Sequence, residues 1–268
     1  MGVSLKSIRV LSSLVEQGLV PKRASILEYG TQNMLWTSKD QEVELAGFIA
    51  QMRSFNGLGT AAVSEWLSEA GTGCLMGDFM LQCGFKYTAI DIASGESTLL
   101  FDLNTDSVPP MLLQKFDLVT NFGTSEHVLN QYNVFRTMHD FTCDHGLMYH
   151  DLPMGGYFFH GYFSYTPLFF FHLAQANNYD IIFRRYWKAA AKEKGQDTPE
   201  EMIQHGWPDS WTQDVGIEFI FRKIGLAPFR VPVEIGTTNG PVDEAYLTAK
   251  GVNFRILAGV HGTVPPTK

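Results

Sequence analysis

Five short apolar runs, with small or acidic residues at or near their ends, constrain the fold of this chain more than any other feature. They cover residues 25–30, 87–92, 98–103, 116–121 and 146–151. Buried parallel strands have this pattern, because both faces are covered and polar groups follow where a strand leaves the sheet. Residues 130–140, between two of the runs, carry apolar side chains at close to helical spacing. Alternating strands and helices predict an α/β domain with a mostly parallel sheet.

Two later runs differ from these five. Residues 178–183 and 215–223 are predicted to be strands at the edge of the sheet. The second run alternates apolar and charged residues near its end, as a half-solvated strand does. Between them, the charged segment 188–204 is predicted to be helical, with Pro199 and two glutamates forming a good helix start.

The first and second runs lie about sixty residues apart, whereas a plain strand–helix–strand unit needs about 30. Residues 35–70 are therefore extra, and they are predicted to form two short helices joined by a glycine turn. The insertion begins directly after the first strand, at the end of the sheet where ligands bind. Its apolar residues Phe48, Ile49, Met52 and Phe55 need a surface to cover. We therefore expect a lid over the ligand.

The length fits one large domain or two small ones, and we expect a single domain spanning residues 1–268. A net charge of −8 argues against a nucleic-acid partner, because phosphate binding needs clustered Lys and Arg. Three cysteines without a close pair favour a reducing cytoplasm over a disulfide framework. Residues 1–18 predict an amphipathic helix rather than a signal peptide. The most apolar stretch, 157–176, is interrupted by polar residues, so a soluble protein with no membrane span is expected.

Polar residues follow the predicted strands at their carboxyl ends, where open α/β sheets bind ligands. The first strand ends in Glu28 and Gly30, and the second ends in Asp91. A carboxylate at the end of the second strand accepts hydrogen bonds from ribose hydroxyls in such folds, although an N-cap role for Asp91 is about equally compatible with the residues beyond it. The fourth run leads into the segment 121–127, Asn-Phe-Gly-Thr-Ser-Glu-His.

In this order, four segments resemble the motifs of the class I methyltransferases that use S-adenosylmethionine. ILEYGT (26–31) resembles the first motif, YTAIDIAS (87–94) the second, FDLN (101–104) the third and FDLVTNFGTSEHV (116–128) the fourth. The resemblance covers roughly residues 22–225. It implies a Rossmann-like methyltransferase fold, with a mostly parallel seven-stranded sheet and helices on both faces. It also implies cofactor contacts from Glu28, Gly30, Thr31, Asp91, Ile92, Asp102, Leu103, Asn121 and Gly123.

The turn after the first strand departs from that family. The usual Gly-x-Gly is replaced, since Gly30 is followed by Thr-Gln-Asn-Met, so the side chain of Thr31 or Asn33 is expected near the amino-acid end of the cofactor. The same turn disfavours a nicotinamide-dependent oxidoreductase, because that fingerprint needs three glycines to seat a pyrophosphate. S-adenosylmethionine carries no phosphate.

Candidate bases and substrate contacts come from the segments that follow the fourth and fifth strands. His127, His150 and His160 are candidate general bases, since a neutral imidazole can take a proton near neutral pH. Glu126, Tyr162 and Tyr165 are predicted to line the substrate site. Glu126 and His127 could form a mixed nitrogen–oxygen metal site with His139, His150 or His160. Some methyltransferases bind a metal through Glu-x-x-Glu-His, but Gly123 stands where the first Glu would be. We therefore expect no metal and activity that survives chelation.

The sequence thus predicts a cytoplasmic S-adenosylmethionine-dependent methyltransferase acting on an oxygen or nitrogen of a small molecule. A catalytically silent methyltransferase-like subunit that binds a partner remains the alternative, with the oxidoreductase third. The tail 240–268 lies beyond the expected last strand and is a candidate contact in a homodimer.

Overall fold

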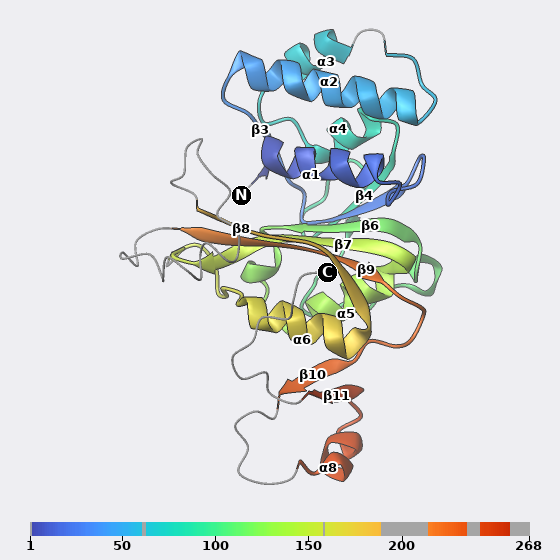
Figure 1. Ribbon diagram of the computed structural model, residues 1–268, viewed down its shortest axis with the longest axis vertical. Helices are drawn as coiled ribbons and strands as arrows, with labels where there is room; N and C mark the ends of the chain where they lie inside the picture. Colours follow the sequence, from blue (N-terminus) through green and yellow to red (C-terminus); the bar gives the residue numbers. More distant parts are fainter. Residues whose placement is uncertain (1, 61–62, 158, 189–213, 235–241, 258–268) are drawn as a thin grey trace.

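The computed structural model describes residues 2–60, 63–157, 159–188, 214–234 and 242–257. Seven strands form its central sheet, with helices packed on both faces (Figure 1). In chain order these strands are β2 (Ser25–Tyr29), β4 (Lys86–Asp91), β5 (Thr98–Leu100), β6 (Phe116–Phe122), β7 (Thr142–Gly155), β8 (Tyr179–Lys188) and β9 (Val215–Lys223). The five strands that the apolar runs predicted are therefore all present.

The strands lie in the order β5-β4-β2-β6-β7-β9-β8. The pairs from β5 to β7 are parallel, and β9 runs antiparallel between β7 and β8. The chain therefore builds outward from β2 in one direction and then restarts at β6 in the other. The switch point lies between β2 and β6, and in open sheets of this kind the ligand site lies at the carboxyl ends of the two strands.

The prediction of two edge strands was half right. β8 is at the edge, whereas β9 is an interior strand and is buried along almost its whole length. Its Glu218 does not face solvent, because it forms an ion pair with Arg185 of β8. Buried Lys223 donates to two backbone carbonyl oxygens, those of His139 and Thr142. Because these charged groups have partners inside the fold, β9 can be buried and does not have the solvated face that its alternating sequence suggested.

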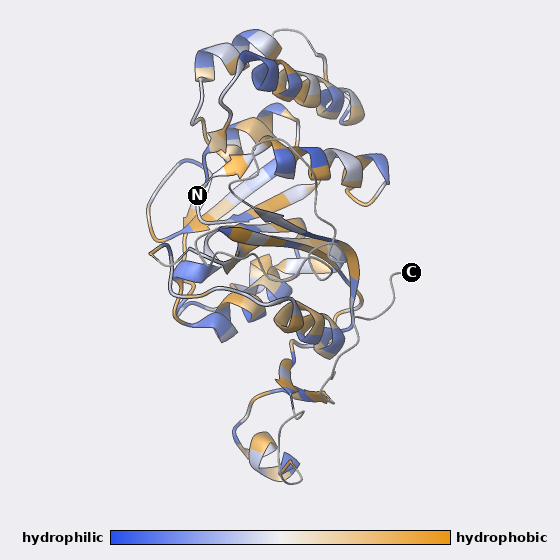
Figure 2. Cartoon of the chain, turned by 60° about the vertical axis from the view of Figure 1, so that its left-hand side comes forward, coloured by the Kyte–Doolittle hydropathy of each residue, from blue (hydrophilic) through white to orange (hydrophobic). Residues whose placement is uncertain are grey.

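Alternating side chains along each strand divide the core between the two faces of the sheet. Ile26, Leu118 and Leu147 point to one face and pack with α1 (Leu5–Glu16) and α4 (Met76–Gln82). Their neighbours Leu27 and Val119 point to the other, where α5 (Gln131–Phe141) and α6 (Pro167–Asn177) lie. Figure 2 shows helices of mixed hydropathy on either side of largely hydrophobic strands. None of the helices in the described ranges could cross a membrane by length and hydropathy.

The insertion forms two helices as predicted, α2 (Lys39–Phe55) and α3 (Val63–Ala70). The first and last residues of the insertion lie side by side. Asn33 forms a β-bridge with Leu75, and Met34 N, at the start of β3 (Met34–Leu35), donates to Cys74 O at 2.7 Å. The inserted segment therefore begins and ends at neighbouring residues, which leaves the strand below it undisturbed.

The apolar face of α2 is already covered, contrary to the reasoning behind the predicted lid. Phe48, Ile49 and Met52 are buried in the core with α1 and α4, and the ring of Phe48 stacks on Phe79 of α4 at 5.7 Å. Arg9 of α1 also pairs with Glu44 of α2. Figure 1 shows α2 and α3 as an outer layer above α1 and α4. The apolar residues Phe48, Ile49 and Met52, which led to the expectation of a lid, are therefore already covered by the chain's own helices.

Part of the C-terminal tail packs on its own chain. β10 (Val231–Glu234) pairs in parallel with β11 (Phe254–Leu257), and α8 (Glu244–Ala249) lies between them in sequence. Arg255 Nη1 donates to the carbonyl of Gln175 in α6 at 2.7 Å. The remaining elements are β1 (Val3–Ser4), which pairs with β3, and the short helices η1 (Pro110–Leu112) and η2 (Ser125–His127). The predicted helix over 188–204 lies almost wholly outside the described residues.

Candidate functional site

The carboxyl ends of β2 and β6 are held together by Thr124, which sequence analysis had not singled out. Its hydroxyl donates to the carbonyl of Tyr29. Gly30 follows with a φ of +69°, and a Cβ there would lie 2.6 Å from Thr124 Oγ1. Only glycine combines that backbone conformation with that close approach. Gly30 is therefore required by the switch point itself.

Gln32, rather than Thr31 or Asn33, turns its side chain into this turn. Its Nε2 donates to Thr124 Oγ1 at 3.2 Å, while its Oε1 is buried with no hydrogen-bond partner among the described residues. Asn33 instead pairs through its backbone with Leu75. The insertion explains the difference, because pairing at its base fixes Asn33 and leaves the preceding side chain free to point inward.

Glu28 is a buried carboxyl at the same edge. One oxygen accepts hydrogen bonds from the hydroxyl of Tyr87 and from Gln32 N, and the other, Oε1, lacks a partner within the described ranges. Burial raises the pKa of Glu28 to about 8, so this carboxyl carries its proton at pH 7. The ring of Tyr87 reaches Glu28 across Gly77 of α4, where a Cβ would lie 2.5 Å from the ring. Gly77 thus allows helix and strand to pack closely.

Asp91 and Ile92 lie beside this turn, because β4 pairs with β2. Asp91 Oδ2 accepts a hydrogen bond from Thr31 N at 2.8 Å, and Oδ1 accepts one from Ala93 N at 3.0 Å. Ile92 is 78% exposed, which leaves a large apolar side chain uncovered next to a polar edge. The structure therefore brings Glu28, Gly30 and Asp91 together as the sequence predicted.

Asp102 and Leu103 differ from the prediction in detail, since β5 ends at Leu100. The Asp102 carboxylate accepts from the backbone and side chain of Asn104, and these bonds lower its pKa. Leu103 is buried in the core below the loop, and its carbonyl accepts from Asn133. The Leu103 side chain is therefore unavailable to a ligand, whereas Asp102 stays near the surface.

Asn121 and Gly123 shape the turn after β6 rather than facing an open site with side chains. Asn121 is fully buried and exchanges two hydrogen bonds with Ser125, through Nδ2 at 2.9 Å and through Oδ1 at 3.2 Å. Gly123 has a φ of +71° and donates its N–H to the carbonyl of Asp151. This locked turn positions the short helix η2, which carries Glu126 and His127.

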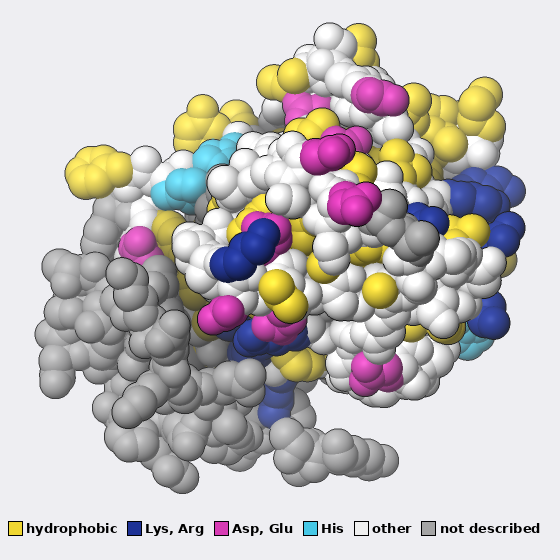
Figure 3. All heavy atoms as spheres, turned by 90° about the horizontal axis from the view of Figure 1, so that it is seen from above, with side chains coloured by type: hydrophobic (Ala, Val, Ile, Leu, Met, Phe, Trp, Pro, Cys, Tyr) yellow, Lys and Arg dark blue, Asp and Glu magenta, His cyan; other side chains and the backbone are white. Residues whose placement is uncertain are grey.

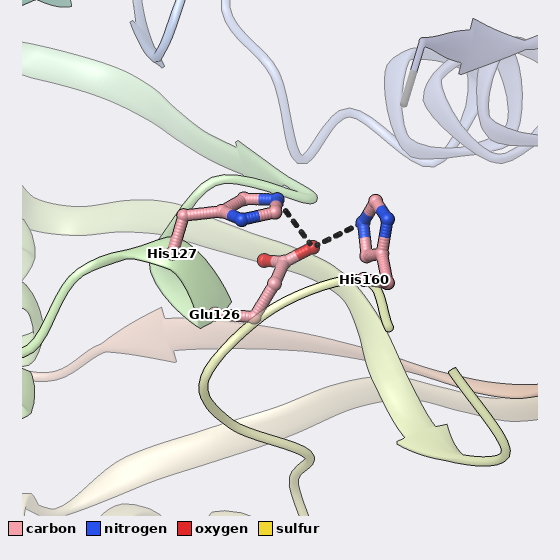
Figure 4. A group of neighbouring side chains, drawn as sticks. All are labelled: Glu126, His127 and His160. Atoms are coloured by element: carbon pink, nitrogen blue, oxygen red, sulfur yellow. Dashed lines mark ion pairs between the residues drawn. The ribbon is translucent and has the colours of Figure 1, made fainter. Parts of the chain in front are cut away.

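Glu126, His127 and His160 converge in the loops beyond β6 and β7 (Figure 4). The Nε2 atoms of His160 and His127 lie 3.5 and 3.9 Å from Glu126 Oε1. Glu126 is fully buried and burial raises its pKa to about 7, whereas the His127 and His160 side chains are 46% and 29% exposed. Figure 3 shows histidine side chains at the surface, in one group at the upper left and another at the lower right. The cluster is thus open to solvent through its imidazoles.

His150 does not belong to this cluster, which corrects its prediction as a base. It is buried in the middle of β7, and its ring lies 5.4–5.6 Å from the rings of Phe135, Phe170 and Phe221. This apolar surrounding lowers its pKa to about 3, so it stays neutral and out of reach of a substrate. It is a core histidine.

The two tyrosines predicted to contact substrate have different surroundings. Tyr165 is buried, and its hydroxyl donates to Gln131 Oε1 at 2.7 Å and lies within hydrogen-bond distance of the Ser125 hydroxyl at 2.9 Å, so it braces the η2 turn. Tyr162 is 74% exposed, and its backbone N–H donates to the carbonyl of Glu126 at 2.7 Å. Only Tyr162 can reach a bound molecule directly.

The strand order decides the fold family. Numbered along the chain within the sheet, it reads 3-2-1-4-5-7-6, with the seventh strand antiparallel. The chain has the Rossmann-like fold of the class I methyltransferases. The fold implied by the sequence motifs is therefore confirmed.

Comparison with solved structures returns matches of low sequence identity. The 1,6-didemethyltoxoflavin-N1-methyltransferase of Burkholderia thailandensis, solved with S-adenosylhomocysteine, matches with 12% identity, coverage of 81% of this chain and 78% of that one, and a TM-score of 0.41. The YcgJ protein of Bacillus subtilis matches with 8% identity, 81% and 99% coverage, and a TM-score of 0.40. The [4+2]-cyclase SpnF matches with 10% identity, 81% coverage of each chain, and a TM-score of 0.41.

Sequence comparisons add no relative: no protein-family model and no curated protein matches the chain significantly. At the identities and TM-scores above, the structural matches carry no information about reaction or substrate. Only the residues at the site of this methyltransferase-like fold therefore indicate a function.

Proposed function

We propose that this protein is an S-adenosylmethionine-dependent methyltransferase that transfers a methyl group to an oxygen or nitrogen of a small molecule. One observation carries the proposal. Among the described residues, eight buried side-chain polar atoms lack a hydrogen-bond partner, and five of them belong to Glu28, Gln32, Glu126 and His160. All four residues follow or end strands at the carboxyl edge of the sheet. Buried polar groups are nearly always paired, so this concentration indicates a polar ligand.

The residues at this edge fit the chemistry of that cofactor. Asp91 supplies acceptors for ribose hydroxyls, and exposed Ile92 supplies an apolar flank for a base. Gln32 and Glu28 have free oxygens near the turn that would face the amino-acid end. A pyrophosphate would meet the side chains of Glu28 and Gln32 at this turn in place of the glycine amides that usually seat it, whereas S-adenosylmethionine carries no phosphate. This difference separates the proposal from a dinucleotide-dependent oxidoreductase.

When bound, the cofactor supplies a methyl group on a positively charged sulfur. The chain has to align a nucleophile with that group and remove its proton. His127 and His160 are partly exposed, lie beside the proposed cofactor position and have Glu126 between them. Burial lowers the pKa of His127, which keeps its imidazole neutral at pH 7. Tyr162 stands next to them as a wall for an aromatic or sugar-like substrate.

Calorimetry tests the proposal directly. The full chain is titrated with S-adenosylmethionine, S-adenosylhomocysteine and, as a comparison, NAD⁺ and NADH. Saturable binding of the two sulfur compounds and none of the nicotinamides is expected. A turnover screen with small alcohols, phenols, amines and sugars then follows, with S-adenosylhomocysteine release as the readout. Binding with no turnover across these classes would favour a silent subunit, and nicotinamide binding would overturn the cofactor assignment.

A further inference from the structure

We propose that Glu126, His127 and His160 form a binding site for one divalent transition-metal ion beside the proposed cofactor site. A carboxylate oxygen and two imidazole nitrogens, one from each residue, lie within 4.8 Å of one another. Ligands at metal bonds of about 2.1 Å are roughly 3–4 Å apart. The measured separations of 3.5 and 3.9 Å between Glu126 Oε1 and the two Nε2 atoms lie in that range. The 4.8 Å limit on the whole group is wider than that range, so a rotation of the partly exposed imidazoles would have to draw the ligand atoms together around an ion.

The buried carboxylate is the second observation that points to a cation. Both oxygens of Glu126 and Nε2 of His160 are buried, and none has a hydrogen-bond partner in the part of the chain that the structure describes. A buried carboxylate without donors is strongly disfavoured. A cation on the open side of Glu126, where both imidazoles point in Figure 4, would satisfy the carboxylate and His160 together.

The backbone already holds the three residues in place. Tyr162 N and Phe163 N both donate to the carbonyl of Glu126, which ties the loop after β7 to the helix η2. Gly161 packs so closely that a Cβ would lie 2.8 Å from Glu126 Cγ. These contacts bring His160 to the Glu126–His127 pair. Gly123 therefore does not exclude a metal, because His160, from another loop, supplies the third ligand.

The donor set selects the ion. Two imidazoles and one carboxylate suit Mn²⁺, Fe²⁺, Co²⁺ or Zn²⁺, whereas Mg²⁺ and Ca²⁺ prefer oxygen ligands throughout. Three protein ligands leave coordination positions open, as catalytic metal sites do. Because His127 and His160 are partly exposed, those positions face solvent. If the proposed function is right, they would take an oxygen of the substrate, which points to a hydroxyl- or phenol-bearing molecule. His127 and His160 would then hold the ion instead of acting as bases, and the ion would lower the pKa of the bound hydroxyl so that it loses its proton more readily.

Metal binding by the tag-free full chain tests the site without any turnover. Co²⁺ and Zn²⁺ are titrated by calorimetry after chelation and dialysis, and bound Co²⁺ is followed by its visible absorption. We expect one ion per chain and at least a tenfold loss of affinity in Glu126→Gln, His127→Ala and His160→Ala. His145→Ala is the matched control, because exposed His145 also lies beside a carboxylate, with Nε2 3.8 Å from Asp144 Oδ2. It should bind Co²⁺ as the wild type does.

Two further measurements keep the result interpretable. Circular dichroism identifies the variants that fold, and Zn²⁺ should raise the melting temperature of the wild type but not of Glu126→Gln. No ion uptake by the wild type, or equal uptake by all variants, would overturn the proposal. S-adenosylhomocysteine affinity is measured on the same samples without metal. Ion binding without cofactor binding would support this metal site and contradict the proposed function. Cofactor binding without ion binding would support the proposed function and contradict this metal site.

Discussion

Asp91 Oδ2 accepts a hydrogen bond from the backbone N–H of Thr31 at 2.8 Å, which joins the end of β4 to the turn after β2. Its second oxygen holds Ala93 N at 3.0 Å. The carboxylate therefore orders the turn at the switch point even before a ligand binds. If Asp91 binds the proposed cofactor, it would contribute to the affinity in two ways, through direct contacts and through a preformed loop.

Asp91→Ala is expected to weaken S-adenosylhomocysteine binding by about ten- to hundredfold, since hydrogen bonds to a charged group are worth about 1.5–3 kcal/mol. Calorimetry on the folded variant measures the change. Asp117→Ala is the matched control, because Asp117 Oδ2 likewise accepts from a backbone amide, Ser25 N at 2.7 Å, but at the amino end of β2, away from the proposed site. It should lose stability and keep its affinity. Equal affinity of Asp91→Ala and wild type would refute the assignment.

Glu28 should make the ligand-free protein less stable as the pH rises. Its pKa is about 8 in the folded state, above the 4.5 of an ordinary glutamate, because burial disfavours the charged form. The folded state therefore holds an extra proton between these values, and the associated stability is lost as the pH rises towards 8. Glu28→Gln cannot titrate. Its unfolding free energy relative to wild type should increase with pH, by at most about 1.4 kcal/mol per unit.

Urea unfolding at pH 5, 7 and 9 measures this difference. Glu96→Gln, at an exposed position after β4, is the control and should run parallel to the wild type. A pH-independent difference between Glu28→Gln and wild type would show that Glu28 ionises normally.

His150 should make the protein acid-sensitive without taking part in turnover. Its pKa is about 3 in the folded state, below the usual 6.5, because it is buried among aromatic rings. The unfolded chain binds the extra proton, so the stability that His150 contributes is present above pH 6.5 and is lost as the pH falls towards 3. His150→Gln should show a shallower loss of stability below pH 6.5, whereas exposed His145→Gln should not. Loss of turnover in a folded His150→Gln would restore it as a base.

The packing of α2 predicts a static insertion. Backbone amides of residues 45–52 should exchange slowly in the free protein and should not change when S-adenosylhomocysteine binds, because Phe48 and Met52 are already in the core. Amides of residues 30–33 in the turn should slow down on binding. Hydrogen–deuterium exchange with mass spectrometry distinguishes the two segments. Ligand-dependent protection of residues 45–52 would bring back the lid.

Periodicity and strand-end residues were enough to predict the α/β class, the five parallel strands and the position of Glu28, Gly30 and Asp91. These features are local, because a buried parallel strand shows itself by its own side chains. β9 was placed wrongly because its Glu218 looks solvated in sequence, and only Arg185 of a neighbouring strand shows why it is buried.

The sequence by itself determined which residues could do chemistry, and the tertiary structure decided which of them meet. Glu126 and His127 are adjacent in the chain, but His160 joins them only because a second loop is bonded to the Glu126 carbonyl. His150 and Tyr165 were equally good candidates by residue type, yet β7 and the η2 turn bury both of them. Burial and hydrogen-bond partners depend on which distant segments pack together, and the local sequence pattern does not specify that packing.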